Sequence, residues 1–598
     1  MPRRTVLLIA VMALALLATV AAPWTLSGGG LTAGIAKQLR DRYGLDLQVR
    51  GRTTLAVLPV PRIKLENVTM FSADGAVAVE GGTVRGELRL LPLLLGRVEL
   101  SDLALSGSRV RLSGDWLQWF KGLAAPRAGT ALRRVVIAGS SIRWPESGEL
   151  EHVNVVVNWA GGDARLDLAG SLSWRGERID VTHASITPAS LLAGRTTPFA
   201  LTLGAPAIHL AVSGEVQPEA DPRVTGASRI EIRSPRDFAR WSGVELPLAS
   251  VLPAVAVEGE FSADRRRLSW PSVLMTVGAD RLDGTLALRF NGGRPGLTGT
   301  LAADRLNLSD VFAPFLQART ATGWSFESLS LAGATGGDLD LRLSAAEASV
   351  GRLKLGDMAV SVLVRPGRIE TSLSRAALNK GTLKGRLTVE HAEAGTELRA
   401  QGGFERVDLG PFLADLGRSR WIAGQASGQF ALQGGGPTVA EVVRTTSGRL
   451  SVAVRQGELV GIGLNEVLKR VEKRPLAASM EWRGGRTPFD LAQLSLTVGG
   501  GIAEVAEGLL TAPALRTSLH GHISLIDRAL DLRALVDPAP SLASSPLIVF
   551  DLTGGWDDVA VVPDAKALIE RSGAAKPLFG ERLHPAARVP SAPMATAE

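Results

Sequence analysis

The chain has 598 residues, of which 45% are hydrophobic and 21% charged, and it contains no cysteine. This apolar fraction is typical of a folded protein, and the lack of cysteine excludes disulfides, thiolate metal sites and a cysteine nucleophile. The formal charge of +7 comes from 66 basic and 59 acidic residues that do not cluster, and only 5% of residues are aromatic. This composition does not favour nucleic-acid binding.

An apolar segment near the N-terminus is the first predicted element. Residues 5–22 carry no charged side chain, and Arg3 and Arg4 precede them. Eighteen residues are at the short end of what a membrane-spanning helix needs, and the preceding basic residues favour a cytoplasmic N-terminus. The alternative is a cleaved signal peptide, although Pro23 would then follow the cut. We predict an uncleaved, single-pass anchor with the rest of the chain on the far side of the membrane.

The hydrophobic period changes soon after this segment. Apolar residues at helical spacing predict a helix over 31–43, and from there the period is mostly two. Alternation of apolar and polar residues predicts strands with one apolar and one wet face. Gly, Asp, Asn and Pro separate these runs. The clearest runs are at 84–90, 339–343, 358–364 and 450–454.

Short helical segments interrupt the strands, and the C-terminal end is rich in Pro and Ala. Four helical segments are predicted, one of them containing Trp116, Trp119 and Phe120. This segment could touch a membrane surface, but a helix that covers the hydrophobic end of a sheet is the better interpretation. Residues 566–598 are predicted to be disordered. The other three helical segments are 310–318, 408–416 and 464–471.

Strands with one apolar face must bury that face. The pattern allows closed sandwiches in series, a propeller or solenoid, or one long curved sheet around an apolar trough. No Ser/Pro-rich linker interrupts residues 50–565, and no 40–50-residue propeller signature occurs. The period of two cannot by itself decide between these architectures.

Motifs in the two ends of the chain, taken in order, resemble the AsmA family of bacterial envelope proteins. The resemblance covers roughly residues 1–115 and 400–565, whereas the middle fits by strand pattern only. The family often has an acidic residue where this chain has Gly463, so the likeness is not close. The motifs are LPVP at 58–61, IKLENV at 63–68, LRLLPLLLGRVELSDLALSGSRVRL at 88–112, VDLGPFLADL at 407–416, TSGRL at 446–450, VGI at 460–462 and GGWDD at 554–558.

The resemblance implies a mainly β protein with an N-terminal transmembrane helix. A long curved antiparallel sheet, U-shaped or taco-like, would follow, with an apolar groove and a few short helices. Members of the family are associated with outer-membrane biogenesis and with glycerophospholipid movement, so the resemblance implies an inner-membrane anchor, a periplasmic body and phospholipid as a partner. The predicted regions are an anchor at 1–22, an N-terminal β region at 23–215, a middle β region at 216–400, a C-terminal β region at 401–565 and a tail at 566–598.

An apolar groove would solvate acyl chains while the head group stays in water. Each buried methylene contributes about 0.8 kcal/mol, so aliphatic strand faces could hold a chain without recognising one lipid. Eight aliphatic residues from the clearest strand runs are the candidate lining. They are Leu339, Leu341, Leu343, Val360, Val362, Leu450, Val452 and Val454.

Motifs for catalysis or cofactor binding are missing from the sequence. His520 and His522 have the spacing of a ligand pair on one strand face, but no carboxylate pattern completes a metal site. No Walker A sequence, dinucleotide loop or nucleophile elbow occurs. We therefore expect neither an enzyme nor a cofactor. The alternative to lipid handling is a periplasmic structural protein that modulates outer-membrane protein assembly through exposed strand edges.

Overall fold

A computed structural model describes most of the chain between residues 29 and 564. The predicted anchor at 5–22, the predicted helix at 310–318 and the predicted tail at 566–598 lie outside the described residues. No helix in the described part is both long and apolar enough to cross a membrane. The described ranges are 29–56, 60–94, 98–114, 116–124, 132–144, 148–159, 163–291, 294–309, 323–329, 331, 333–393, 395–471, 483–538, 548–556 and 558–564.

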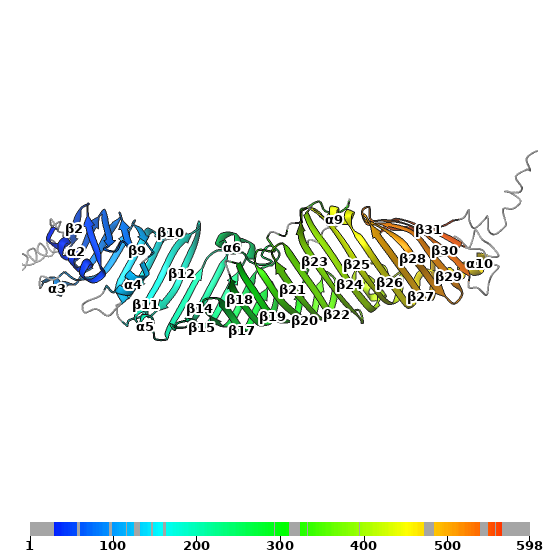
Figure 1. Ribbon diagram of the computed structural model, residues 1–598, viewed down its shortest axis with the longest axis horizontal. Coiled ribbons are helices and arrows are strands. Elements are labelled where there is room, and N and C mark those ends of the chain that lie inside the picture. Colours follow the sequence, from blue (N-terminus) through cyan, green and yellow to red (C-terminus); the bar gives the residue numbers. More distant parts are fainter. Residues whose placement is uncertain are drawn as a thin grey trace, which may run out of the picture. The chain divides into compact units, whose positions relative to one another are not determined.

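The protein is mainly β, as predicted, with strands making up 67% of the structure. It divides into two compact units, and within each unit long strands lie side by side (Figure 1). The first unit comprises Met1–Ala302 and Gly336–Leu339, and the second comprises Ala303–Thr335 and Asp340–Glu598. The division falls within the predicted middle region, and the predicted boundaries at 215 and 400 stay predictions.

The first unit begins with three helices packed around a group of short strands. Pairing does not follow chain order here: β1 pairs with β4 and β5 with β8, while β7 and β8 both run parallel to β9. The helices are α2 (Gly29–Tyr43), α3 (Leu90–Leu94) and α4 (Trp116–Ala124), and the strands are β1 (Leu45–Val49), β2 (Thr53–Ala56), β3 (Arg62–Glu66), β4 (Val68–Ser72), β5 (Val77–Glu80), β6 (Thr83–Leu88), β7 (Leu100–Ser106), β8 (Arg109–Leu112) and β9 (Arg134–Trp144).

A compact core holds these elements together. Ile35 and Leu39, one helical turn apart on α2, are each 2% exposed and pack against the inward residues of the strands. Trp119 of α4 packs on the same core, and its indole N–H donates to the carbonyl of Tyr43 at 3.1 Å. The helix predicted at 31–43 is therefore confirmed, and α4 covers one side of this core.

One detail of the predicted strand pattern is wrong. The alternation at 84–90 predicted a strand through Leu90, but β6 ends at Leu88 and Leu90 begins α3. Pro92 explains the difference, because proline cannot donate a ladder hydrogen bond and is tolerated in the first turn of a helix.

The rest of the first unit is a meander in which each strand pairs antiparallel with the next. This pairing runs from β9 through β18, and two short helices occupy connections between strands. The elements are β10 (Gly148–Asn158), β11 (Leu166–Trp174), β12 (Glu177–Ile186), α5 (Pro188–Leu192), β13 (Thr197–Gly204), β14 (Ile208–Gln217), β15 (Arg223–Ile232), α6 (Pro235–Ser242), β16 (Val255–Ala263), β17 (Arg267–Val277) and β18 (Asp280–Asn291).

The second unit is also built of successive antiparallel strands. Pairing follows chain order from β21 to β32, and the helices predicted at 408–416 and 464–471 are confirmed as α8 and α10. The remaining elements are β19 (Arg294–Asn307), β20 (Asp338–Val350), β21 (Leu353–Arg365), β22 (Arg368–Leu378), β23 (Gly381–Ala392), β24 (Gly395–Asp408), α8 (Leu409–Asp415), β25 (Ile422–Gly436), α9 (Val439–Thr445), β26 (Ser447–Ile462), α10 (Leu464–Val471), β27 (Arg483–Gly499), β28 (Ile502–Ala512), β29 (Leu515–Ser524), β30 (Ala529–Pro538), β31 (Ile548–Gly555) and β32 (Asp558–Pro563).

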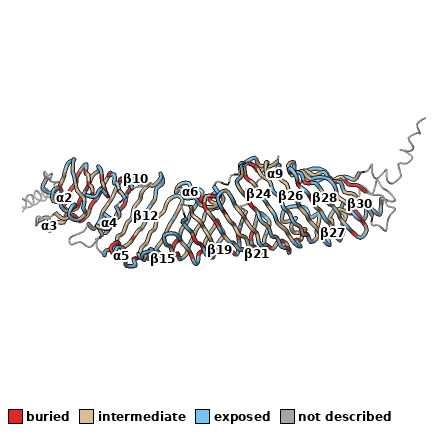
Figure 2. The backbone as a smooth tube through the Cα atoms, viewed as in Figure 1, coloured by how far each residue is buried: buried red, intermediate tan, exposed pale blue. Residues whose placement is uncertain are grey.

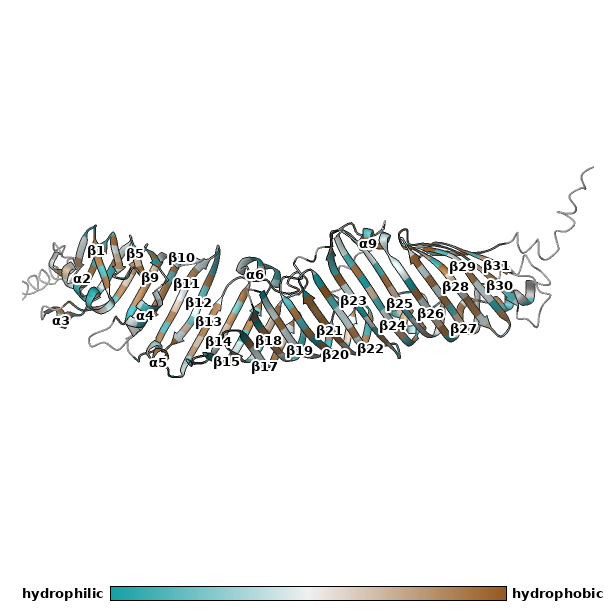
Figure 3. Cartoon of the chain, viewed as in Figure 1, coloured by the Kyte–Doolittle hydropathy of each residue, from teal (hydrophilic) through white to brown (hydrophobic). Residues whose placement is uncertain are grey.

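Burial along these strands alternates with the sequence. Most strand residues are either half-buried or exposed, and fully buried residues are sparse in the long strands (Figure 2). Hydrophobic and hydrophilic positions alternate along the strands (Figure 3). A two-layered sandwich would bury one face of every strand, so this pattern indicates a single-layered sheet in each unit.

Candidate functional site

The predicted lining residues on β20 follow the expected alternation. Leu339 is 3% exposed, and Leu341 and Leu343 are half-buried, whereas Asp340 and Arg342 between them are exposed. Side chains at i and i+2 of a strand share a face, so the three leucines lie on one face of β20. The structure thus separates Leu339, a core residue, from two leucines that stay partly accessible.

On β21 the same separation occurs. Val360 and Val362 are half-buried, and Val364 at the strand end is fully buried. The antiparallel register places Val360 opposite Leu373 and Val362 opposite Thr371 on β22. Cross-strand partners share a face, so the apolar side of β21 continues onto β22.

On β26, the first two predicted residues along the strand are partly accessible, and the third is a core residue. Leu450 and Val452 are half-buried, whereas Val454 is 5% exposed and belongs to a core with Phe489 and Leu515. The eight predicted residues therefore form two groups. Leu339 and Val454 are buried in the fold, and the other six stay partly accessible.

The strand registers extend this surface across the second unit. Leu450 lies opposite Phe430 of β25 and Leu496 of β27, and the same row continues through two glycines to β22. At about 4.8 Å per strand, such a row of six strands is roughly 24 Å wide. We call this side of β21–β27 the apolar face. Its half-buried residues are Val360, Val362, Leu373, Leu387, Ala400, Phe430, Leu432, Leu450, Val452 and Leu494.

Two aromatic rings lie close to glycines on the apolar face. A Cβ on Gly402 would be 2.9 Å from Cζ of Phe430, and a Cβ on Gly428 would be 2.7 Å from Cζ of Phe404. Both distances are too short for real carbon contacts, so each ring occupies the space that a side chain would fill. The rings cover the glycine backbone and form part of an aliphatic and aromatic surface. Sequence reasoning missed these pairs because they join residues of different strands.

Short helices cover the two ends of this surface. At one end, Leu464 and Val467 of α10 pack into the core around Val454 and Phe489. At the other end, α9 lies against β25, where Glu441 and Val442 approach the backbone of Gly434 and Gly436. Between these ends the aliphatic side chains stay half-buried, which means that no second layer of the described chain covers them.

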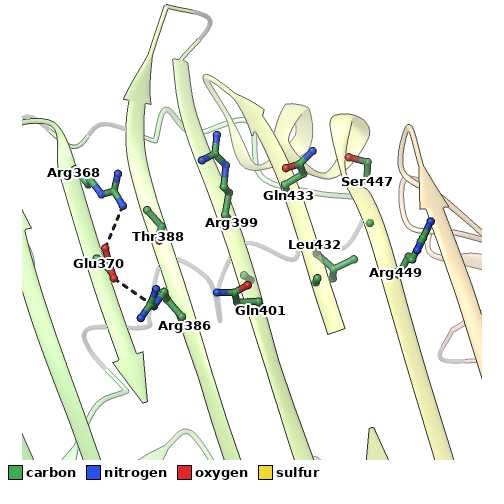
Figure 4. Close-up of a pocket in the computed structure, with 13 residues that line it drawn as sticks. Arg368, Glu370, Arg386, Thr388, Arg399, Gln401, Leu432, Gln433, Ser447 and Arg449 are labelled. Atoms are coloured by element: carbon green, nitrogen blue, oxygen red, sulfur yellow. Dashed lines mark hydrogen bonds and ion pairs between the residues drawn. The ribbon is translucent and has the colours of Figure 1, made fainter. Parts of the chain in front are cut away.

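The opposite side of the same strands is polar, and we call it the polar face. Arg368 is 3.2 Å from Glu370 and 3.3 Å from Glu390, and Arg386 is 3.4 Å from Glu370 (Figure 4). Arg399 continues the network through Glu390 at 3.4 Å and through Glu397 at 2.8 Å. The arginine side chains are about half exposed and the glutamates 22–31% exposed, so solvent partly screens each pair. The charged side chains keep this side of the sheet hydrated.

Two hollows lie over these strands. The smaller one, of about 480 Å³, is lined mainly by polar-face residues, among them Arg368, Arg386 and Arg449 (Figure 4). The larger one, of about 1070 Å³, is lined by consecutive residues of several strands, so its wall combines apolar-face and polar-face positions. Of the predicted lining residues, Leu450 belongs to its wall.

Among the described residues, no group of three or more His, Asp or Glu side chains is placed to bind a metal ion. His520 and His522 are both exposed on β29, as expected for the wet face of a strand.

These features define a class of protein in which a single-layered antiparallel sheet, seen here in the second unit, has one apolar and one charged side. Residues 316–507 match the model of the AsmA family. This match confirms the family resemblance, and the chain carries an AsmA-family region that includes most of the apolar face. It overlaps the motifs at 407–462 and also takes in part of the middle region, where only the strand pattern had fitted.

The match over residues 316–507 indicates a role in the cell envelope and in outer-membrane biogenesis. The comparisons with curated proteins and with solved structures found no match.

Proposed function

We propose that this protein binds the acyl chains of glycerophospholipid on the apolar face of β21–β27 and holds or transfers them during outer-membrane biogenesis. The observation that carries the proposal is the half-burial of aliphatic and aromatic side chains in a row that crosses the strands and includes Gly385 and Gly402, with no second layer over them in the part of the chain that the structure describes. Soluble proteins rarely leave such a large apolar patch uncovered unless something else binds there.

Physical chemistry favours an acyl chain as the missing layer. Each methylene that leaves water contributes about 0.8 kcal/mol. The apolar face carries no charged side chain among its defining residues, so it offers little to a polar ligand and does not discriminate between chains of similar length. The mechanism needs no reaction, cofactor or metal ion, and we propose that the protein is not an enzyme.

The proposal includes the membrane topology predicted from the sequence. Residues 5–22 would anchor the chain in the bacterial inner membrane with a cytoplasmic N-terminus, and the strands would lie in the periplasm. Outer-membrane or envelope assembly proteins would be the partners that receive the lipid.

Site-specific photo-crosslinking tests the proposal on the full chain in bacterial cells. Benzoylphenylalanine replaces Leu387 or Leu450 on the apolar face, and the controls carry it at the adjacent exposed residues Arg386 and Arg449. Neighbouring side chains on a strand point to opposite faces, so each control places the crosslinker on the opposite face of the same strand. We expect phospholipid adducts by mass spectrometry at 387 and 450 and few at 386 and 449.

Crosslinks to protein instead of lipid at positions 387 and 450 would contradict the proposal. That result would support the alternative function, in which the apolar face or a strand edge contacts outer-membrane proteins during their assembly.

A further inference from the structure

An exposed apolar patch lies at one end of the short strands in the first unit. Leu91 of α3 is 75% exposed, Leu90 is 48% exposed and Val60 is 38% exposed. Val60 and α3 lie close together, because the N–H of Leu88 donates to the carbonyl of Pro61 at 2.8 Å. We call Val60, Leu90 and Leu91 the α3 patch.

The rest of the α3 region is firmly held, so the exposure of the patch is not a consequence of a loose loop. Leu93 of α3 packs on the core that also contains Ile35, and Leu88 and Leu100 on either side of the connection are each 2% exposed. The fold therefore presents Leu90 and Leu91 outward on a fixed support.

α3 shares a hydrophobic core with the first turns of α2. Leu93 of α3 and Leu31 of α2 both pack against this core. A Cβ on Gly34 would lie 3.1 Å from Val98, and Gln38 accepts a hydrogen bond from the N–H of Leu100 at 3.4 Å, so the start of β7 and the two residues before it lie beside α2.

Chain length limits how far the membrane can be from this point. Six residues, 23–28, separate the predicted anchor from the first residue of α2. A fully extended segment of this length spans at most about 20 Å. With residues 5–22 as the anchor, the start of α2 would lie within that distance of the bilayer surface, and the α3 patch would be on the same core of the first unit.

We propose that the α3 patch inserts into the bilayer from which the chain emerges. Two adjacent leucines and a valine on a rigid support gain free energy when they enter the acyl boundary of a bilayer. This contact would hold the first strands at the membrane surface. The inference rests on the anchor that the proposed function includes, and it goes beyond that function by naming a second membrane contact.

Because the chain has no native cysteine, single-cysteine variants label one position each. Leu91→Cys and Val60→Cys carry an environment-sensitive fluorophore in the full chain, reconstituted into phosphatidylethanolamine–phosphatidylglycerol vesicles. Arg109→Cys is the matched control, because Arg109 is exposed and follows the end of β7 that is opposite to α3. We expect a blue shift and quenching by lipids with brominated acyl chains at 91 and 60, and neither at 109.

Three results would overturn the inference. The first is no quenching at position 91. The second is a blue shift at 91 that brominated lipid does not quench, which would mean that a protein covers the patch, and the third is equal quenching at 109. A fourth variant, Leu450→Cys, reports lipid on the apolar face in the same vesicles. A signal at 91 without one at 450 supports the patch and contradicts the proposed function, so the two ideas fail separately.

Discussion

At the scale of single residues, the apolar strand positions have two different roles. Val454, midway along β26, is 5% exposed and belongs to the core that α10 also contacts, whereas Val452, two residues earlier on the same face, is half-buried. Both are valines on one strand, so sequence alone gives them the same role. The two residues differ in their position relative to α10, which packs against the core around Val454.

This difference predicts unequal losses of stability for the same substitution at the two positions. Val454→Ala removes two buried methyl groups and should destabilise β26 by about 2 kcal/mol, including the cost of the cavity. Val452→Ala should cost less than about 1 kcal/mol because its side chain is already partly in water. Hydrogen exchange of the β26 amides, followed by mass spectrometry, measures both. Equal costs would show that Val452 is covered by protein.

At the scale of elements, the helices that close the strand ends are fixed by buried polar contacts. Thr487 of β27 is fully buried, and its hydroxyl accepts from the N–H of Leu464 at 2.9 Å and donates to the carbonyl of Ile462 at 2.7 Å. It thereby satisfies the first N–H of α10, which has no partner within its own helix.

Replacing this threonine by valine preserves its shape but removes both hydrogen bonds. Thr487→Val should destabilise α10 by about 1–3 kcal/mol, because a buried N–H and a buried carbonyl lose their partner. Amide exchange in α10 should rise accordingly. The control is Thr497→Val on the same strand, where the side chain is exposed and little change is expected. Faster exchange in both variants would argue against a specific role for the Thr487 hydroxyl.

Much of the element structure could be predicted from the sequence. The period of two located most of the long strands, and helical spacing located α2, α8 and α10. Pairing near the N-terminus could not be predicted, because alternation defines the face of a strand and not its partner. The parallel contacts of β9 with β7 and β8 depend on residues far apart in sequence.

The candidate site was predicted only in part. Alternation correctly placed six half-buried aliphatic residues, but it could not distinguish them from Leu339 and Val454, whose burial depends on other elements. The aromatic rings over Gly402 and Gly428 and the ion pairs of the polar face arise from strand register, which a single sequence does not reveal.

At the scale of the whole molecule, both units contain long strands with one apolar side and one polar side. Each long strand contacts mainly its neighbours, its charged side faces water, and its apolar side is fully buried at only some positions, such as Val454 and Phe489. A sheet of this kind remains incompletely buried by itself. An acyl chain lying across the strands would complete the burial, which explains why aliphatic side chains persist where no protein covers them.

Mass spectrometry of the lipid that copurifies with residues 31–565, prepared without detergent, tests lipid binding most directly. We expect stoichiometric glycerophospholipid with the unmodified chain and with the control Ser451→Asp/Ala453→Asp, whose charges lie on the opposite side of β26. Leu450→Asp/Val452→Asp should lose the lipid while remaining folded. A folded but lipid-free unmodified chain, or equal lipid in both double variants, would contradict binding at the apolar face.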